Sequence, residues 1–129
     1  MSNRDLNIPE RLNGQTFGYP VKAGVRIYGR SLIALTASGL AVPVDHPDAV
    51  AFAGIAIQAI DNLDGIDGAT KVTVRRDVRG FNFAATPADL NKTVYASNNE
   101  VLSLEANAGL RVGVIVGLDN GRVWIDLSK

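Results

Sequence analysis

The chain contains no cysteine and only one histidine in 129 residues. The lack of cysteine excludes disulfide bonds and thiolate chemistry, and it leaves the redox compartment undecided. The single histidine, His46, lies between Asp45 and Pro47, away from any nucleophile motif or metal-ligand spacing. We therefore interpret His46 as a solvent-exposed turn residue, and we expect no catalytic residue, no metal and no cofactor.

The chain also has no excess of either charge, because 13 Lys and Arg balance 13 Asp and Glu. Nucleic-acid binders normally carry a surplus of basic residues for phosphate contacts, so we expect no nucleic-acid partner. Long apolar runs are missing too: the longest, Ala49–Ile57, is far too short to span a bilayer. The polar first 14 residues lack the apolar core of a signal peptide, so the sequence predicts no membrane partner and synthesis in the cytoplasm.

The chain is rich in short stretches in which apolar and polar or small residues alternate. The clearest is Arg111–Leu127, RVGVIVGLDNGRVWIDL, where Val112, Val114 and Val116 alternate with their neighbours. Asp119-Asn120-Gly121 then supplies a turn, and the alternation resumes after it. Asn-Gly favours tight hairpin turns, which need positive φ. This segment predicts a β-hairpin.

The same pattern predicts a small all-β fold, either a β-barrel or a β-sandwich of about ten short strands. One short helical turn is expected at Thr86–Leu90, with Thr86 as N-cap and Pro87 at the first position. A bend at Arg79-Gly80 would reconcile Val78 with the phenylalanines that follow. Residues 61–68 are expected to form a loop. The other expected strands are Phe17–Val21, Val25–Tyr28, Ser31–Thr36, Leu40–Val44, Phe52–Ile60, Lys71–Val78, Val94–Ala96 and Val101–Leu104.

We expect two parts, an N-terminal arm at residues 1–15 and one β-domain at residues 16–129. The first 15 residues are polar, contain Pro9 and Gly14, and show neither a strand nor a helix period. Two readings of them stay open: a frayed terminus, or an arm that becomes ordered against a neighbouring subunit.

Two clusters of charge are candidates for chemistry. Asp61, Asp64 and Asp67 lie at intervals of three, but Leu63 and Ile66 interrupt the ligand alternation that calcium loops use. A plain polar loop is favoured there over a calcium site.

The second cluster is Arg75, Arg76 and Arg79, followed by Phe81 and Phe83. Basic residues beside aromatics can bind single-stranded nucleic acid, but the neutral chain favours a protein interface or a solvated strand face. Trp124 is on the opposite hairpin face from its two apolar neighbours. It either packs on a second sheet or anchors an interface.

The order of several segments resembles a known family. These segments are VKAG (Val21–Gly24), FAGIA (Phe52–Ala56), DNLDGIDGATKVTVRR (Asp61–Arg76), TVYASNNEV (Thr93–Val101) and the closing Arg111–Leu127. Together they resemble the small head decoration, or capsid cement, proteins of tailed bacteriophages. The resemblance covers about residues 16–128 and lies in the spacing of strands and turns.

The resemblance implies a structural virion protein on the capsid exterior. Such a protein binds the expanded lattice of the major capsid protein, stabilises the shell by clamping neighbouring capsid subunits, and forms homo-oligomers, with a trimer favoured. No small-molecule substrate is expected. The interface with the capsid or with other subunits is expected to include Asn7, Ile8, Pro9, Leu12, Phe17, Tyr19, Arg76, Arg79 and Trp124.

Three alternatives stay open. The first is another structural virion component, such as a β-protein of the tail or baseplate. The second is a small β-barrel that binds oligonucleotides, which the neutral charge disfavours. The third is a trimeric all-β nucleotide hydrolase, for which Asp61–Asp67 would supply acidic groups without a matching Ser-rich phosphate loop.

Overall fold

The computed structural model describes residues 16–98, 101–119 and 121–129. The predicted arm at residues 1–15 therefore lies outside the described residues, and with it the candidate interface residues Asn7, Ile8, Pro9 and Leu12. Asn120 of the predicted hairpin turn lies outside them as well, as do Asn99 and Glu100.

The described residues form two five-stranded antiparallel sheets and one two-stranded ribbon. In spatial order the first sheet contains β1 (Thr16–Pro20), β7 (Lys71–Arg75), β5 (Ala51–Ala56), β3 (Leu32–Leu35) and β4 (Ala41–Pro43). The second contains β10 (Leu102–Ser103), β9 (Thr93–Ala96), β11 (Leu110–Asp119), β12 (Arg122–Asp126) and β8 (Val78–Phe81). The ribbon pairs β2 (Val25–Ile27) with β6 (Ile60–Asn62), and the two 3₁₀ turns are η1 (Pro87–Asp89) and η2 (Ala106–Ala108).

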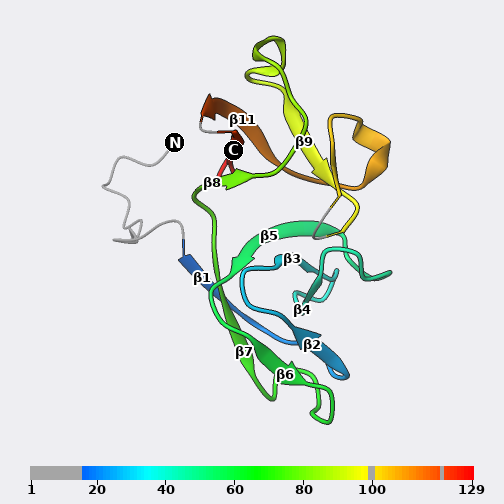
Figure 1. Ribbon diagram of the computed structural model, residues 1–129. Helices are drawn as coiled ribbons and strands as arrows, with labels where there is room; N and C mark the ends of the chain where they lie inside the picture. The colour runs from blue at the N-terminus through cyan, green and yellow to red at the C-terminus, as the bar shows by residue number, and fades with distance from the viewer. Residues whose placement is uncertain (1–15, 99–100, 120) are drawn as a thin grey trace, which may run out of the picture.

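This arrangement confirms the all-β prediction in its sandwich form, since the sheets do not close into a barrel. In Figure 1 the second sheet lies above the first, with β5 beneath it. The described residues contain twelve strands and two helical turns, where the sequence predicted about ten strands and one turn. The extra elements are short: β6 and β8 arise where predicted strands are divided, and η2 has three residues.

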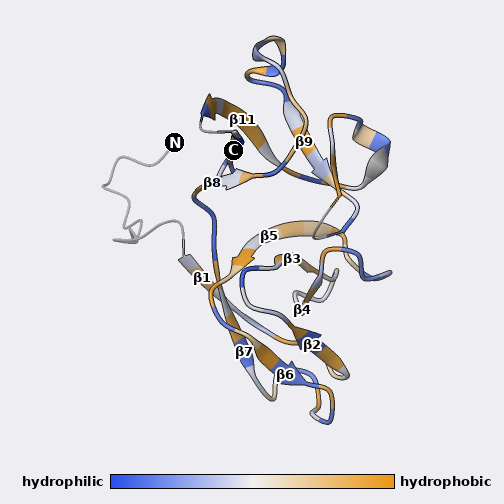
Figure 2. Cartoon of the chain, viewed as in Figure 1, coloured by the Kyte–Doolittle hydropathy of each residue, from blue (hydrophilic) through white to orange (hydrophobic). Residues whose placement is uncertain are grey.

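One hydrophobic core extends through both sheets. Val72 and Val74 of β7 are fully buried while Lys71 is exposed, as expected for a strand with one face on the core. β5 differs, because all residues from Phe52 to Ala56 are buried. It lies in the middle of the first sheet and also contacts β11 of the second, so neither of its faces is open to solvent. Figure 2 shows β5 as a largely hydrophobic strand.

The predicted continuous strand Lys71–Val78 is wrong. β7 ends at Arg75, the chain passes through Arg76 and Asp77, and β8 then pairs with β12 in the other sheet. Val78 is 46% exposed instead of continuing the buried face. The expected bend at Arg79-Gly80 thus lies too late, because the chain must leave one sheet before it can pair in the other.

The predicted strand Phe52–Ile60 is also interrupted. β5 ends at Ala56, Ile57 is 46% exposed, and β6 begins at Ile60 to pair with β2. Asp61 and Asn62 consequently belong to a strand, although the sequence predicted a loop from residue 61.

The C-terminal hairpin is confirmed as β11 paired with β12. The expected common face of Val112, Val114 and Val116 is wrong, however, because Val116 is 38% exposed while Ile115 is fully buried. The pairing of β11 shifts register on both sides, against β9 and against β12, and each bulge reverses the alternation.

The helical turn at η1 is confirmed, with Thr86 as N-cap and Pro87 at its start. The Thr86 backbone N–H donates to Asp89 Oδ2 at 2.9 Å, and Lys92 Nζ donates to Asp89 Oδ1 at 3.0 Å. The Thr86 hydrogen bond first, and the Lys92 contact second, hold the pKa of Asp89 below its usual 3.8.

Asn62 is a buried polar residue that organises the loop after β6. Its side chain is 2% exposed, and its Nδ2 donates to the carbonyls of Val21 at 3.1 Å, Lys22 at 3.1 Å and Ile66 at 3.0 Å. A Cβ at Gly65 would collide with Asn62 Oδ1, so only glycine leaves room for this amide. One side chain therefore ties the loop between β6 and β7 to the segment between β1 and β2.

We expect Asn62→Ala to lower the free energy of unfolding by about 1–3 kcal/mol, because it removes the buried amide that bonds to the Val21, Lys22 and Ile66 carbonyls. Urea denaturation of the full chain measures the effect. The matched control is Asn82→Ala at an exposed position, which should change stability by less than about 0.5 kcal/mol. Equal effects of the two substitutions would contradict the structural role of Asn62.

We expect Asp89→Asn to give a small, pH-dependent loss of stability. A carboxyl with a lowered folded pKa contributes stability above its unfolded value of 3.8, and that contribution disappears as the pH falls through the lower folded pKa. The native chain should therefore be the more stable one at about pH 6, and the difference should shrink at about pH 2.5. A difference that is independent of pH would show that the charge of Asp89 plays no part.

Candidate functional site: an arginine hollow between the sheets

The described surface has hollows of different kinds. One, of about 490 Å³, lies at the end of the β11–β12 hairpin between Phe83, Leu118 and Arg122. The second, about 460 Å³, lies between Lys22, Pro47 and Asp67.

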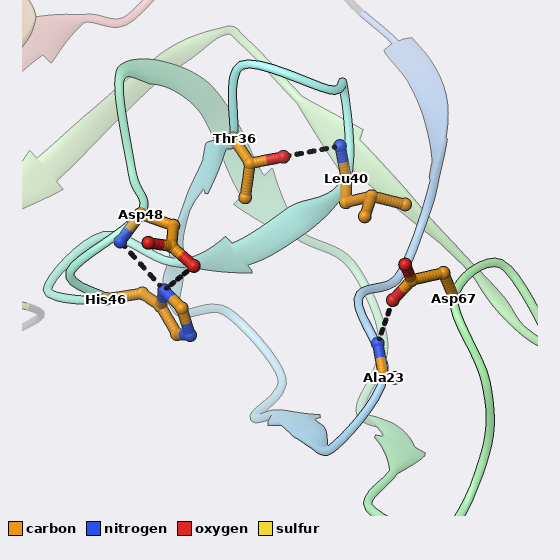
Figure 3. A network of polar contacts seen from close by, with 6 residues as sticks. All are labelled: Ala23, Thr36, Leu40, His46, Asp48 and Asp67. Carbon is orange, nitrogen blue, oxygen red and sulfur yellow. Dashed lines mark hydrogen bonds and ion pairs between the residues drawn. The ribbon is translucent and has the colours of Figure 1, made fainter.

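Thr36, Asp48 and Asp67 line the second hollow, and each makes a polar contact within the chain, as Figure 3 shows. Leu40 N donates to Thr36 Oγ1 at 3.2 Å, and Ala23 N donates to Asp67 Oδ1 at 2.8 Å. The first bond closes a turn and the second joins two loops, so these polar groups hold the loops around the hollow together.

His46 is less exposed than expected, since its side chain is only 24% exposed. Asp48 N donates to His46 Nδ1 at 3.0 Å, so this nitrogen accepts and the neutral ring carries its proton on Nε2. In this tautomer the 4.0 Å approach of Nδ1 to Asp48 Oδ2 is not an ion pair. His46 thus serves the turn between β4 and β5.

Two of the three predicted loop carboxylates, Asp61 and Asp67, accept hydrogen bonds within the chain. Asp61 Oδ1 accepts from Leu63 N at 3.0 Å, and Asp67 bonds across to Ala23 as described above. Within residues 16–98, 101–119 and 121–129, no three His, Cys, Asp or Glu side chains are grouped so that they could hold a metal ion. The loop instead displays two large apolar side chains, Leu63 at 50% and Ile66 at 77% exposure.

The third hollow is the smallest of these, about 250 Å³, and it carries the strongest concentration of one charge. It lies where the two sheets meet and is lined by Arg30, Ile55, Ala56, Ile57, Arg75 and Arg79. We call it the arginine hollow. Arg30 precedes β3, Arg75 ends β7, Arg79 lies on β8, and the C-terminal end of β5 supplies the apolar lining.

The three guanidinium groups differ in their partners. Arg79 Nε donates to Asp77 Oδ1 at 2.7 Å in a half-buried ion pair. Arg75 Nε is buried and has no hydrogen-bond partner among the described residues. Arg30 is exposed and adopts φ +61°. One of the three arginines is therefore paired within the described part of the chain, and two are not.

The sequence predicted only part of this site. Arg75 and Arg79 belong to the basic cluster noted there, but Arg30 is remote in the chain and has no local signal. Arg76, the third member of the cluster, serves a different purpose: its Nε donates to the Leu127 carbonyl at 2.9 Å, and its guanidinium lies 5.9 Å from the centre of the Phe52 ring.

The aromatic candidates lie against their own molecule. Phe17 and Tyr19 stack with ring centroids 6.4 Å apart and are partly buried against the core. Trp124 is half-buried, and its ring lies next to Gly80, its partner on β8, where an added Cβ would approach the ring to 3.2 Å. The arginine hollow brings together none of these three residues.

Comparisons with protein-family models, with curated proteins and with solved structures gave no match. No helix in the described residues is long and apolar enough to cross a membrane.

We expect Arg76→Ala to destabilise the chain by about 1–3 kcal/mol, because it removes a charged donor from the Leu127 carbonyl and the contact with Phe52. Arg111→Ala, at an exposed position of β11, is the control and should change stability little. Thermal and urea unfolding of both variants test this. An unchanged midpoint for Arg76→Ala would show that Arg76 does not stabilise the fold, and would favour the protein interface or solvated strand face that the sequence predicted.

Proposed function

We propose that this chain is a structural virion protein that decorates the outside of an expanded bacteriophage capsid as a homo-oligomer and clamps neighbouring major capsid proteins. The family resemblance of the segments quoted above supports it. Those segments correspond to the connection between β1 and β2, to the central strand β5, to the end of β6 with the following loop and β7, to β9, and to the β11–β12 hairpin. Together they make up much of the sandwich, and a rigid β-sandwich suits a protein whose task is to present surface.

The observation that carries the proposal is the way the loop between β6 and β7 displays Leu63 and Ile66. The two side chains are 50% and 77% exposed, yet the loop beneath them is fixed by buried Asn62 and by Asp67. An apolar side chain on a loop whose backbone is already ordered costs less conformational entropy on binding, which favours a protein contact. A loop held by internal hydrogen bonds that leaves two large apolar side chains exposed indicates an interaction surface.

A lattice partner explains how modest contacts suffice. A single copy that inserts one or two apolar side chains gains only a small binding free energy. An oligomer that touches several capsid subunits at once gains avidity because the later contacts are intramolecular. We therefore expect weak binding to an isolated capsid subunit and tight binding to the assembled shell.

The test is co-sedimentation of the full chain with expanded and unexpanded empty heads of its phage, with the copy number read from gel densitometry. We expect saturable binding to expanded heads at a stoichiometry tied to the lattice. Binding to neither form would overturn the proposal, and binding to isolated tails would favour the tail or baseplate alternative.

The loop is tested by Ile66→Ser, with Leu90→Ser as the matched control at an exposed apolar position beside η1. Ile66→Ser should keep the unfolding midpoint of the native chain and bind expanded heads about tenfold more weakly. Equal binding by the two variants would show that the loop does not contact the shell.

A further inference from the structure

The arginine hollow concentrates positive charge in a chain whose net charge is zero. Three arginines line it, and Asp77, bound to Arg79, is the carboxylate in ion-pair contact with any of them among the described residues. The hollow therefore carries a local excess of two positive charges. Like charges brought together in this way repel one another unless an anion joins them.

Arg75 lines the hollow and has a side-chain donor without a partner. Its Nε is buried and lacks a hydrogen-bond partner among the described residues. A buried donor without a partner is unfavourable, and such a group in a native structure calls for an explanation. Nε is itself covered by protein atoms, so an anion in the hollow would compensate the guanidinium through its charge rather than through Nε.

Arg30 provides an independent observation, because it occupies a backbone conformation that suits glycine. Its φ of +61° is in the left-handed region, where a side chain causes strain. The conformation is enforced by the surrounding turn: Arg30 N donates to the Ala56 carbonyl at 2.7 Å, and Ser31 Oγ donates to the Tyr28 carbonyl at 2.7 Å. An arginine in a conformation where glycine would be relaxed points to a use for the guanidinium itself.

The size and lining of the hollow limit what it can hold. At about 250 Å³ it is smaller than the roughly 300–1,000 Å³ of pockets that enclose whole organic ligands. Its other lining residues, Ile55, Ala56 and Ile57, are apolar, and the first two are buried. More of the exposed surface of the hollow is polar than apolar, which suits a small charged group.

We propose that the arginine hollow binds one oxyanionic group, a carboxylate or a phosphate, through Arg30, Arg75 and Arg79. Guanidinium groups match both anions because their parallel N–H donors form paired, charge-assisted hydrogen bonds to two oxygens. The group comes either from free phosphate or from an acidic side chain. The site goes beyond the decoration role and does not depend on it.

The experiment is an NMR titration of the full chain that follows the side-chain Nε–Hε resonances of arginine. Inorganic phosphate is added in one series and N-acetylglutamate in a second, with sodium chloride at matched ionic strength as the reference. We expect saturable shifts of the Arg75 and Arg79 resonances in at least one anion series and none with chloride. Saturation by phosphate alone identifies free phosphate as the source, whereas saturation by the carboxylate identifies an acidic side chain.

Two variants and a control separate binding from folding. Arg75→Gln should weaken anion binding about tenfold or more, because it removes a charged donor. Arg30→Gly should also weaken binding about tenfold, but without lowering the unfolding midpoint, because glycine relieves the strain at φ +61°. Arg111→Gln, on exposed β11, should bind as the native chain does.

Shifts that do not saturate, or that chloride reproduces, would overturn the proposal. Native affinity in folded Arg30→Gly and Arg75→Gln would overturn it as well. If Arg75→Gln fails to fold, the decision falls to Arg30→Gly: a stable variant with reduced affinity supports the site, and one with native affinity refutes it.

Discussion

The two sheets of this protein are joined by the short crossing from β7 to β8, and the rest of the structure depends on the hydrogen bonds made there. Arg76 Nε donates to the Leu127 carbonyl, and Leu127 N donates to the Asp77 carbonyl at 3.0 Å. These bonds attach the last buried residue of the chain to the segment that leaves the first sheet. Buried backbone groups must be paired, so the crossing satisfies the end of the second sheet while it sets its position.

The same crossing creates the arginine hollow. Because β7 ends at Arg75 and β8 begins at Val78, Arg75 and Arg79 come from different sheets and still line one depression beside the end of β5. Arg76, between them, points to Leu127 and supports the junction. The neighbouring arginines thus differ: Arg76 stabilises the fold, Arg79 is paired with Asp77, and Arg75 has no ion-pair partner among the described residues.

The second feature of the molecule is a pair of surface loops held by hydrogen bonds. Asn62 places three hydrogen bonds under the loop that displays Leu63 and Ile66, and the Tyr28–Ser31 turn holds Arg30 in a strained conformation. In both places, hydrogen bonds hold the backbone of a loop that carries exposed side chains. Ordered surface loops are expected of a protein that acts through its surface, because preorganised groups lose less entropy on binding.

The sequence by itself determined the all-β class, the C-terminal hairpin, the turn at η1 with its Thr86 cap, and most strand positions, because these follow from alternation and turn residues that act locally. It did not show that Lys71–Val78 divides between two sheets, since Val78 continues the apolar period of Val72 and Val74. It also did not show that Asn62 is buried, or that Arg30 joins Arg75 and Arg79. Those features depend on which strands pair across long stretches of chain, and only the tertiary structure decides that pairing, because it is set by shared burial rather than by local pattern.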